Sequence, residues 1–228
     1  MVAETGCDLT AEEAGRLGVY LVPMHVSMGN ETRTDGSFPP EEVCAHYDKT
    51  GKVPQTSAAS QYDFECVFDE IERGYPGASI VHLAYSAVTT ASFHNALMAA
   101  AGSGYDVRCV DTKHVSVGQR AIVLAAIRLL REHPDMTPDL LCQAVEALSP
   151  RTHMTFVPQN LNYLRAGGRV SNAAALISGV LNLHPAIHVT AGSSSPGANT
   201  AATWSRSRKG WCETRPKRTT SGVTASGS

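Results

Sequence analysis

The stretch NLNYLRAGGRVSNAAALISGVLNLHP, residues 160–185, has the pattern of two helices joined by a glycine corner. Gly167-Gly168 breaks the chain after a short leucine-bearing segment, because glycine reaches backbone angles that other residues adopt only at a cost. Ser171 or Asn172 is a suitable N-cap for the alanine-rich segment that follows, and the proline at its end stops that segment. The pattern predicts a tightly packed elbow of two helices. A structural αα-corner and a binding site explain it equally well.

Towards the N-terminus, the chain alternates apolar strand patterns with amphipathic helix patterns. Strands are expected at residues 19–26, 79–84, 107–111 and 153–157, which are apolar and rich in β-branched side chains. Helices are expected at residues 10–18, 61–72, 92–101, 118–132 and 137–148, with one more opening near residue 41. Residues 1–9 look turn-like, and residues 52–60 look like a polar loop. This alternation predicts an α/β layer fold whose largely parallel sheet is flanked by helices.

The charge of the chain changes at Ala191. From there onward six basic residues face one acidic residue, so the tail carries +5. The first 190 residues hold 13 basic and 20 acidic residues, a net charge of −7. The tail is rich in Ser, Gly and Thr without hydrophobic periodicity, a composition that does not bury a core. We expect an N-terminal α/β domain at 1–152, an incomplete C-terminal α/β domain at 153–190, and an irregular or disordered tail at 191–228.

Composition argues against several classes of protein. The net charge of −2 is unlike that of a dedicated nucleic-acid-binding protein, which is usually basic. No run of 18 apolar residues is present, so we expect no membrane span, and the first residues show no signal-peptide pattern. The six cysteines are scattered without a C-x-x-C pair, as in a protein whose thiols stay reduced. These features predict a cytoplasmic protein.

Two hydroxyl-bearing segments lie where strands are expected to end. Thr56-Ser57 belongs to the polar loop at 52–60, and Thr89-Thr90 follows the expected strand at 79–84. In open α/β folds, ligands gather outside the carboxyl ends of the strands. Both segments are therefore candidate ligand-binding sites.

Several ordered motifs resemble those of one family. They are YLRAGGRVS at 163–171 with LNLHP at 181–185, ETGCDL at 4–9, VPMHV at 22–26, PQTS at 54–57 and DTKHVSVG at 111–118. Together they resemble the DegV family, bacterial cytosolic proteins that bind a long-chain fatty acid. The resemblance covers roughly residues 3–190, and Glu4 stands where the family motif has aspartate. It implies that the domain at 153–190 is part of a lipid-binding domain.

The resemblance also implies a binding site for the carboxylate of the fatty acid. The family's Pro-x-Thr-Ser threonine falls on Thr56, and its second hydroxyl partner, aligned backward from residues 93–96, falls on Thr90 or on Thr89. Supporting positions implied in the same way are Ser57, Ser92, Gly167, Gly168 and Arg169, the last either binding an anion or capping helices. The implied function is non-enzymatic: the protein presents the fatty acid to a partner fatty-acid kinase, with the acid as ligand and no cofactor.

An α/β hydrolase acting on a small ester or carboxylate is the alternative, with Ser86 or Ser92 as nucleophile. Neither serine lies in a G-x-S-x-G elbow. His184 and His188 are spaced as a zinc pair would be, but the intervening Pro185 interrupts the helical face, so we expect no metal site. No Walker or G-x-G-x-x-G sequence is present.

Compared with the family pattern, the chain looks truncated at both ends, which raises the further alternative of a non-functional remnant. The tail from Ala191 departs from the family, and little of the family's first strand precedes Glu4. Losing half of the wall around an acyl chain removes on the order of 6 kcal/mol of binding free energy, about four orders of magnitude in affinity. We therefore expect weak or absent binding of palmitate by these 228 residues.

Overall fold

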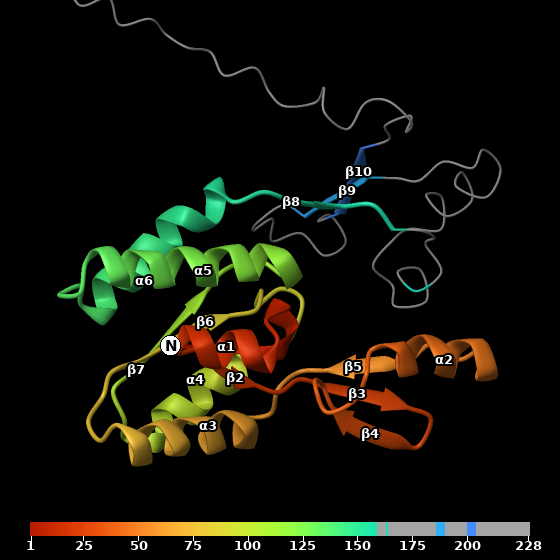
Figure 1. The fold of residues 1–228 in the computed structure, drawn as a ribbon, viewed down its shortest axis with the longest axis horizontal. Coiled ribbons are helices and arrows are strands. Elements are labelled where there is room, and N and C mark those ends of the chain that lie inside the picture. The colour runs from red at the N-terminus through yellow and green to blue at the C-terminus, as the bar shows by residue number, and fades with distance from the viewer. Residues whose placement is uncertain (159–162, 164–185, 190–199, 204–228) are drawn as a thin grey trace, which may run out of the picture.

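The computed structural model describes residues 1–158, 163, 186–189 and 200–203. Four parallel strands form its main sheet, in the order β2-β1-β6-β7 (Figure 1). Their bounds are Val2–Glu4 for β1, Tyr20–Val22 for β2, Ile80–Ala84 for β6 and Val107–Asp111 for β7. The predicted α/β layer with a parallel sheet flanked by helices is confirmed.

β1 is a strand that the sequence analysis did not predict. Residues 1–9 looked turn-like, yet all three residues of β1 are 0% exposed and the strand lies between β2 and β6. Val2 is the partner of Tyr20 in β2 and of His82 in β6. Three residues are too few to show a hydrophobic period. β1 forms because β2 and β6, the strands on either side of it, offer hydrogen-bonding edges that it can join.

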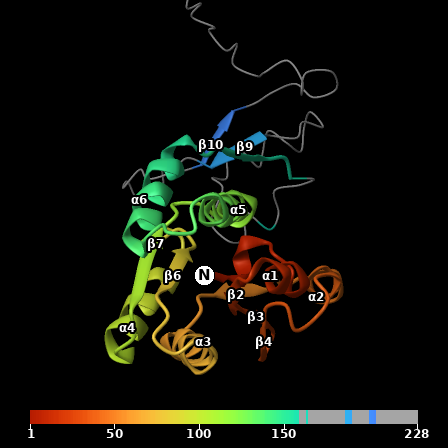
Figure 2. The same ribbon diagram turned by 60° about the vertical axis from the view of Figure 1, so that its left-hand side comes forward.

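Helices cover both faces of this sheet (Figure 2). One face packs on α1, α5 and α6, and the other on α3 and α4. The helices are α1 Ala11–Leu17, α2 Glu41–Thr50, α3 Gln61–Gly74, α4 Ser92–Ser103, α5 Ser116–Glu132 and α6 Pro138–Leu148, with short 3-10 turns at Thr5–Cys7 and Ser149–Arg151. β6 supplies side chains to both hydrophobic cores, because successive strand residues point to opposite faces.

The ends of the helices follow the signals in the sequence. Thr10 and Ser60 each form a capping box, with Glu13 and Asp63 respectively, in which side chain and backbone satisfy each other's hydrogen bonds. Gly18, at φ 70°, ends α1 in the left-handed conformation that glycine adopts without strain.

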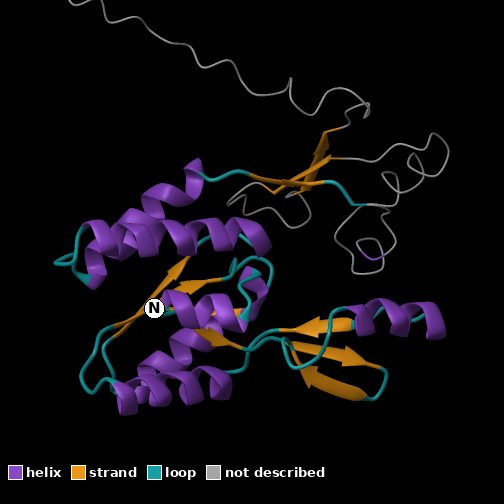
Figure 3. Ribbon diagram, viewed as in Figure 1, coloured by secondary structure: helices purple, strands orange, loops and turns teal. Residues whose placement is uncertain are grey.

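A second, antiparallel sheet has the order β4-β3-β5 (Figure 3). It consists of β3 His25–Met28, β4 Glu31–Thr34 and β5 Gln55–Ser57. The single strand expected at 19–26 is wrong: β2 ends at Val22 and β3 begins at His25, with Pro23 between them. Proline has no N–H for a ladder, so it suits the point where the chain leaves one sheet for another.

A third sheet is antiparallel, with the order β10-β9-β8. Its strands are β8 Met154–Phe156, β9 Ala186–Val189 and β10 Thr200–Thr203. β10 lies beyond Thr190, where the structured chain was expected to end, and within the stretch expected to be irregular. Apart from Tyr163, the helical elbow expected at 160–185 lies outside the described residues.

Candidate functional site

Thr56 and Ser57 lie on β5, an edge strand of the second sheet, and both are exposed. Thr56 is the partner of Val26 in β3. The sequence analysis placed these hydroxyls in a loop near the carboxyl end of a parallel strand, which is wrong. A three-residue polar strand has no pattern of its own, and β5 exists because β3 offers it a hydrogen-bonding edge.

The connection from β6 to α4, residues 85–91, lies at the carboxyl end of the main sheet, as expected. It carries Thr89, which is exposed, and Thr90, which is half-buried. The Thr89 hydroxyl donates to the Ser86 carbonyl at 2.8 Å. Thr90 Oγ1 lies 3.2 Å from Ser92 Oγ and accepts from the Ser92 N–H at 3.3 Å.

Ala59 joins the two hydroxyl-bearing segments. It lies two residues after β5, is 0% exposed, and donates its N–H to Ser92 Oγ at 3.2 Å. Its carbonyl accepts from Asn95 Nδ2 at 2.7 Å. The segment after Thr56 is thus held against the first turn of α4, next to Thr90. These segments are 33 to 36 residues apart in the chain.

Hydrogen-bond directions distinguish Thr90 from Thr89. The Thr89 hydroxyl already donates its proton to the Ser86 carbonyl. Ser92 Oγ accepts from Ala59, and when it gives its own proton to Thr90 Oγ1, the Thr90 proton is available to a ligand. A carboxylate only accepts hydrogen bonds, so a hydroxyl with an uncommitted proton is the group that it needs.

The N-terminus of α4 adds partial positive charge to the same place. Its N-cap residue, Ala91, has no side-chain oxygen to satisfy the first-turn amides. The backbone N–H groups of the first turn and the positive end of the helix dipole both favour an anion at a helix N-terminus. Thr90 therefore lies where a carboxylate is electrostatically favoured.

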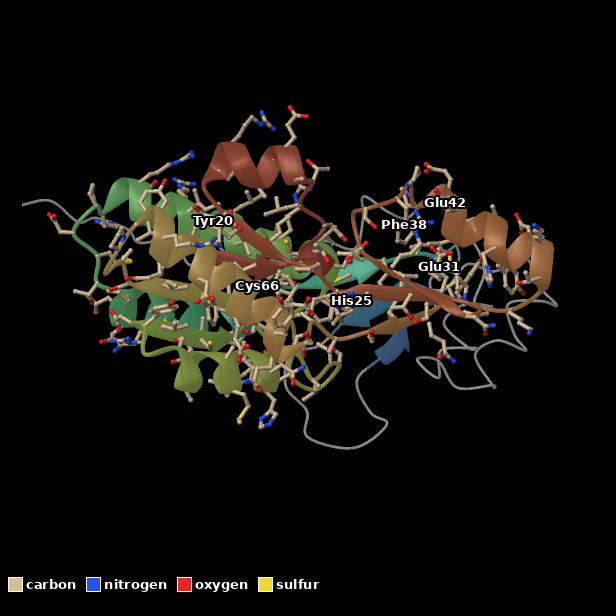
Figure 4. The ribbon with its side chains drawn as sticks, turned by 90° about the horizontal axis from the view of Figure 1, so that it is seen from below. Tyr20, His25, Glu31, Phe38, Glu42 and Cys66 are labelled. Carbon is tan, nitrogen blue, oxygen red and sulfur yellow. The ribbon has the colours of Figure 1, made fainter. Side chains whose placement is uncertain are left out.

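A side-chain hydrogen bond joins the second sheet to α3. His25 Nε2 lies 2.9 Å from Asp63 Oδ2, which also accepts from the Ser60 hydroxyl at 2.6 Å. Burial alone would raise the pKa of Asp63, but hydrogen bonds from Ser60 and the contact with His25 lower it. Figure 4 shows His25 where the second sheet meets the body of the molecule. Because His25 is the partner of Ser57 in the sheet, this contact also orients β5.

On the opposite side of β3 from β5, an arginine joins β4 to the start of α2. Arg33 Nη1 lies 2.5 Å from Glu42 Oε2, and its guanidinium lies 4.3 Å above the ring of Phe38. Glu31, Phe38 and Glu42 gather there in Figure 4. This cluster holds the hairpin and α2 together, and Arg33 and Thr56 are both partners of Val26, on opposite sides of β3.

Sequence reasoning missed a buried ion pair beneath the site. Glu4 Oε1 and His82 Nε2 are 3.3 Å apart, and both side chains are 0% exposed. Glu4 Oε2 accepts from the Tyr85 N–H and from Gln119 Nε2, both at 2.9 Å. His82, inside the apolar run at 79–84, could have revealed this pair. A polar residue in a fully buried strand needs a partner, so its position implied a second buried polar group.

The pair keeps both groups charged. Burial alone would lower the pKa of His82, but the Glu4 carboxylate raises it to about 9. Cys109, the partner of His82 in β7, acts in the same direction. Burial alone would raise the pKa of Glu4, yet His82 and the hydrogen bonds from Tyr85 and Gln119 lower it. Beside Glu4, burial raises the pKa of the Cys7 thiol to about 11.

The remaining expected site residues have different outcomes. Gly167, Gly168 and Arg169 lie outside the described residues. Residues 80–83 of β6 pack into the two hydrophobic cores. Ser92, a candidate nucleophile, is 0% exposed, and its hydroxyl bonds to the Ala59 N–H and the Thr90 hydroxyl, neither of which is a base.

An open pocket of about 630 Å³ lies elsewhere, between α1 and α3 at the amino ends of β1 and β2. Met1, Gly18, Tyr20 and Ile71 are among its lining residues. Thr90 follows the carboxyl end of β6, which in a parallel sheet is the opposite edge. The pocket is therefore separate from the two threonines.

Fold and site together define an α/β layer protein in which the expected binding residues, Thr56 and Thr90, lie on a small antiparallel sheet and at the carboxyl end of a parallel sheet. The family model described as "Uncharacterised protein, DegV family" matches residues 1–209. The chain belongs to the DegV family. A DegV domain-containing protein of Deinococcus radiodurans is 27% identical over 192 residues, covering 84% of this chain and 66% of that protein. The chain thus spans just under two thirds of this relative's length.

Solved structures of the family share the fold. A DegV family protein from Thermus thermophilus, whose structure is described as showing fatty acid binding, has a TM-score of 0.73 and 27% identity, over 89% of this chain and 69% of that one. A stearic acid-binding protein from Eubacterium ventriosum has a TM-score of 0.72 at 23% identity, over 84% of this chain and 69% of that one. At that identity, the second likeness concerns the fold alone.

Two negative findings concern only the described part of the chain. No helix there is both long and apolar enough to cross a membrane. Nor do three or more His, Cys, Asp or Glu side chains within residues 1–158, 163, 186–189 and 200–203 gather in a way that could hold a metal ion.

Proposed function

We propose that this protein binds a long-chain fatty acid and that Thr56 and Thr90 hold the carboxylate. The observation that carries the proposal is the Ala59 bridge, which joins the segment after Thr56 to the first turn of α4 beside Thr90. Membership of a family with fatty-acid-binding relatives supports the choice of ligand.

The physical terms are favourable for such a ligand. Each hydrogen bond from a threonine hydroxyl to a carboxylate contributes about 1.5–3 kcal/mol, because the acceptor is charged. Each buried methylene of the acyl chain adds about 0.8 kcal/mol. The carboxylate contacts select the acid, and the chain supplies most of the affinity.

Exposure of the site supports a carrier rather than a hydrolase. Thr56, Ser57 and Thr89 are all exposed, so the carboxylate end of the ligand would face solvent. A partner fatty-acid kinase could then transfer phosphate to it without the acyl chain leaving the protein. In this proposal the protein is not an enzyme, needs no cofactor and acts in the cytoplasm.

The test is an NMR titration of the ¹⁵N-labelled 228-residue protein with palmitate delivered from cyclodextrin. Amide shifts report weak binding as well as tight binding. We expect the largest changes at residues 57–60 and 89–93. Palmitic acid methyl ester, which has no carboxylate, should leave these amides unchanged, and cyclodextrin alone is the blank.

Variants of the threonines test which hydroxyls bind the carboxylate. Thr56→Val and Thr90→Val should each raise the dissociation constant at least about tenfold, the loss of one charge-assisted hydrogen bond. Thr89→Val should change it by less than about twofold, because its hydroxyl bonds to Ser86 instead. Thr34→Val, on β4, is the matched control. An unchanged dissociation constant in Thr56→Val would contradict the proposed site.

A further inference from the structure

Three residues at the carboxyl end of β1, Glu4, Thr5 and Gly6, contact both connections that lead to the two threonines. We call them the β1 junction. The junction hydrogen-bonds to Met24 and Tyr85, and it includes neither of the two proposed carboxylate-binding threonines. Its hydrogen bonds run to the start of each connection, so each half can be followed separately.

The half that leads to Thr90 begins at Tyr85, the first residue after β6. Its N–H donates to Glu4 Oε2 at 2.9 Å, which fixes where the chain leaves the sheet. Gln119 Nε2 donates to the same oxygen at 2.9 Å and to the Leu83 carbonyl at 2.8 Å. Thr90 follows five residues after Tyr85, so a shift at Tyr85 is passed along a short connection.

The half that leads to Thr56 begins at Met24, directly before β3. Its N–H donates to Thr5 Oγ1 at 3.0 Å. Two residues later, Val26 is the partner of Thr56 in the antiparallel sheet. Thr5 therefore sets the position of β3, and β3 sets the position of Thr56.

Gly6 brings the two halves together. A Cβ atom added to it would lie 2.9 Å from Met24 Sδ and 2.9 Å from Tyr85 Cε2. Both side chains pack directly onto this glycine. The two connections are thus anchored within three consecutive residues.

Charge keeps the Glu4 acceptor in place. Glu4 Oε1 lies against His82 Nε2, so its two oxygens face three nitrogen groups. Glu4 Oε2 accepts both hydrogen bonds, whereas Oε1 has no hydrogen-bond partner among the described residues and is stabilised by the charge of His82. Removing one member of a buried charged pair is costly, because it leaves the other unpaired. The carboxylate is held by groups on α5, on β6 and at the start of the connection to α4.

We propose that Glu4 and Thr5 are positioning residues for the fatty-acid carboxylate, setting the spacing of Thr56 and Thr90 through Met24 and Tyr85. This inference rests on the proposed function of the two threonines. It adds residues that touch no ligand and yet determine affinity.

Thr5→Val tests the Met24 half, because valine keeps the shape of threonine and removes its acceptor oxygen. We expect the palmitate dissociation constant to rise about fivefold to tenfold, the net effect of one lost hydrogen bond. The Met24 amide should exchange with deuterium faster. Thr5→Ser restores the oxygen and should restore both properties, which a purely steric role would not do. Thr34→Val is again the control.

Glu4 variants test the Tyr85 half. Glu4→Gln keeps an oxygen for Tyr85 and Gln119 and offers its amide N–H to neutral His82, so affinity should stay within about threefold of the original. Glu4→Met removes the acceptor, so the Tyr85 amide should exchange faster and affinity should fall at least about tenfold. Thermal melts establish which variants are folded. If Glu4→Met does not fold, the Thr5 comparison decides.

Failure of this inference and failure of the proposed function look different. If the unmodified protein shows no palmitate-dependent shifts, the proposed function fails, and deuterium exchange of the ligand-free Thr5→Val protein still tests the junction. Unchanged exchange at residues 55–57 in that variant would overturn the inference for the Met24 half, and unchanged exchange at residues 89–92 in a folded Glu4→Met protein would overturn it for the Tyr85 half. So would an unchanged palmitate dissociation constant in a folded Thr5→Val protein whose Met24 amide has lost its protection.

Discussion

His82 is a protonated histidine inside a sheet whose neighbouring side chains are mostly apolar. Phe64 of α3 packs edge-on to its ring at 4.9 Å, and the side chain is 0% exposed, so its charge is removed from bulk solvent. Glu4 stabilises that charge. Removal of either partner destabilises the fold, because it leaves the other as an unpaired buried charge. The pair therefore couples the folding of the main sheet to pH.

The stability of the protein should fall as the pH rises from about 6.5 to about 9. The pKa of His82 is about 9 in the fold against its usual 6.5, so its contribution to stability is complete below pH 6.5 and lost as pH approaches 9. The lowered pKa of Glu4 works in the other direction: its contribution is present above pH 4.5 and lost as pH falls. Urea unfolding should show a free energy of unfolding lower at pH 9 than at pH 6 by on the order of 3 kcal/mol.

The double variant Glu4→Gln, His82→Gln is the control, since it removes both charges and keeps hydrogen-bonding groups. Its free energy of unfolding should depend less on pH over the same interval. The comparison matters because burial lowers the pKa of the Met1 amine, which makes stability rise towards pH 8 and partly masks His82. Equal pH profiles for the two proteins would show that the pair does not titrate on unfolding.

Among the elements, the start of α3 connects local helix capping to the candidate site. Ser60 caps α3 through Asp63, and Asp63 also holds His25 of β3. The residue before Ser60 is Ala59, which bridges to Ser92 of α4. One helix N-terminus thus ties the second sheet, α3 and α4 together.

Ser60→Ala should lower the free energy of unfolding by about 1 kcal/mol, the usual effect of losing an N-cap. Thr10→Ala, which removes the matching capping box of α1, should have a similar effect on stability. Only Ser60→Ala should speed deuterium exchange of the Ala59 amide. Urea unfolding and exchange measured on both variants check this, and equal exchange at Ala59 would argue against the coupling.

At the scale of the whole molecule, the described residues divide into a well-buried main sheet and less buried elements around it. β6 is buried along its full length, whereas α2 has no buried residue and β4 is mostly exposed. α2 reaches the chain after residue 158 through Tyr47, whose ring centroid lies 4.9 Å from that of Tyr163.

Native-state deuterium exchange should follow this division. Amides of β1 and β6 should exchange last, because they open only with global unfolding, and those of α2 and β4 should exchange first. A mass-spectrometric time course of peptides spanning residues 1–9, 31–50 and 80–84 measures the order directly. Slow exchange in α2 would mean that residues beyond the described ones cover it.

Sequence patterns were enough for the helices and for the longer strands of the main sheet. The N-caps that the structure shows at Thr10, Ser60 and Thr137 and the apolar runs in β6 and β7 involve residues close together in the chain, and such local features survive into the fold. Likewise, Thr90 was placed by its position after β6. These features depend on neighbouring residues in the chain, which a sequence displays.

Tertiary structure alone decided the short strands, the joining of the two threonine segments and the buried pair. β1 and β5 have three residues each, too few for a pattern, and pair only because β2, β6 and β3 lie beside them. Glu4 and His82 are 78 residues apart and meet because parallel pairing brings β1 and β6 side by side. By itself, the sequence determined which residues could form helices, strands and hydrogen bonds. Packing decided which of them meet, because contacts between distant residues depend on how the sheets assemble.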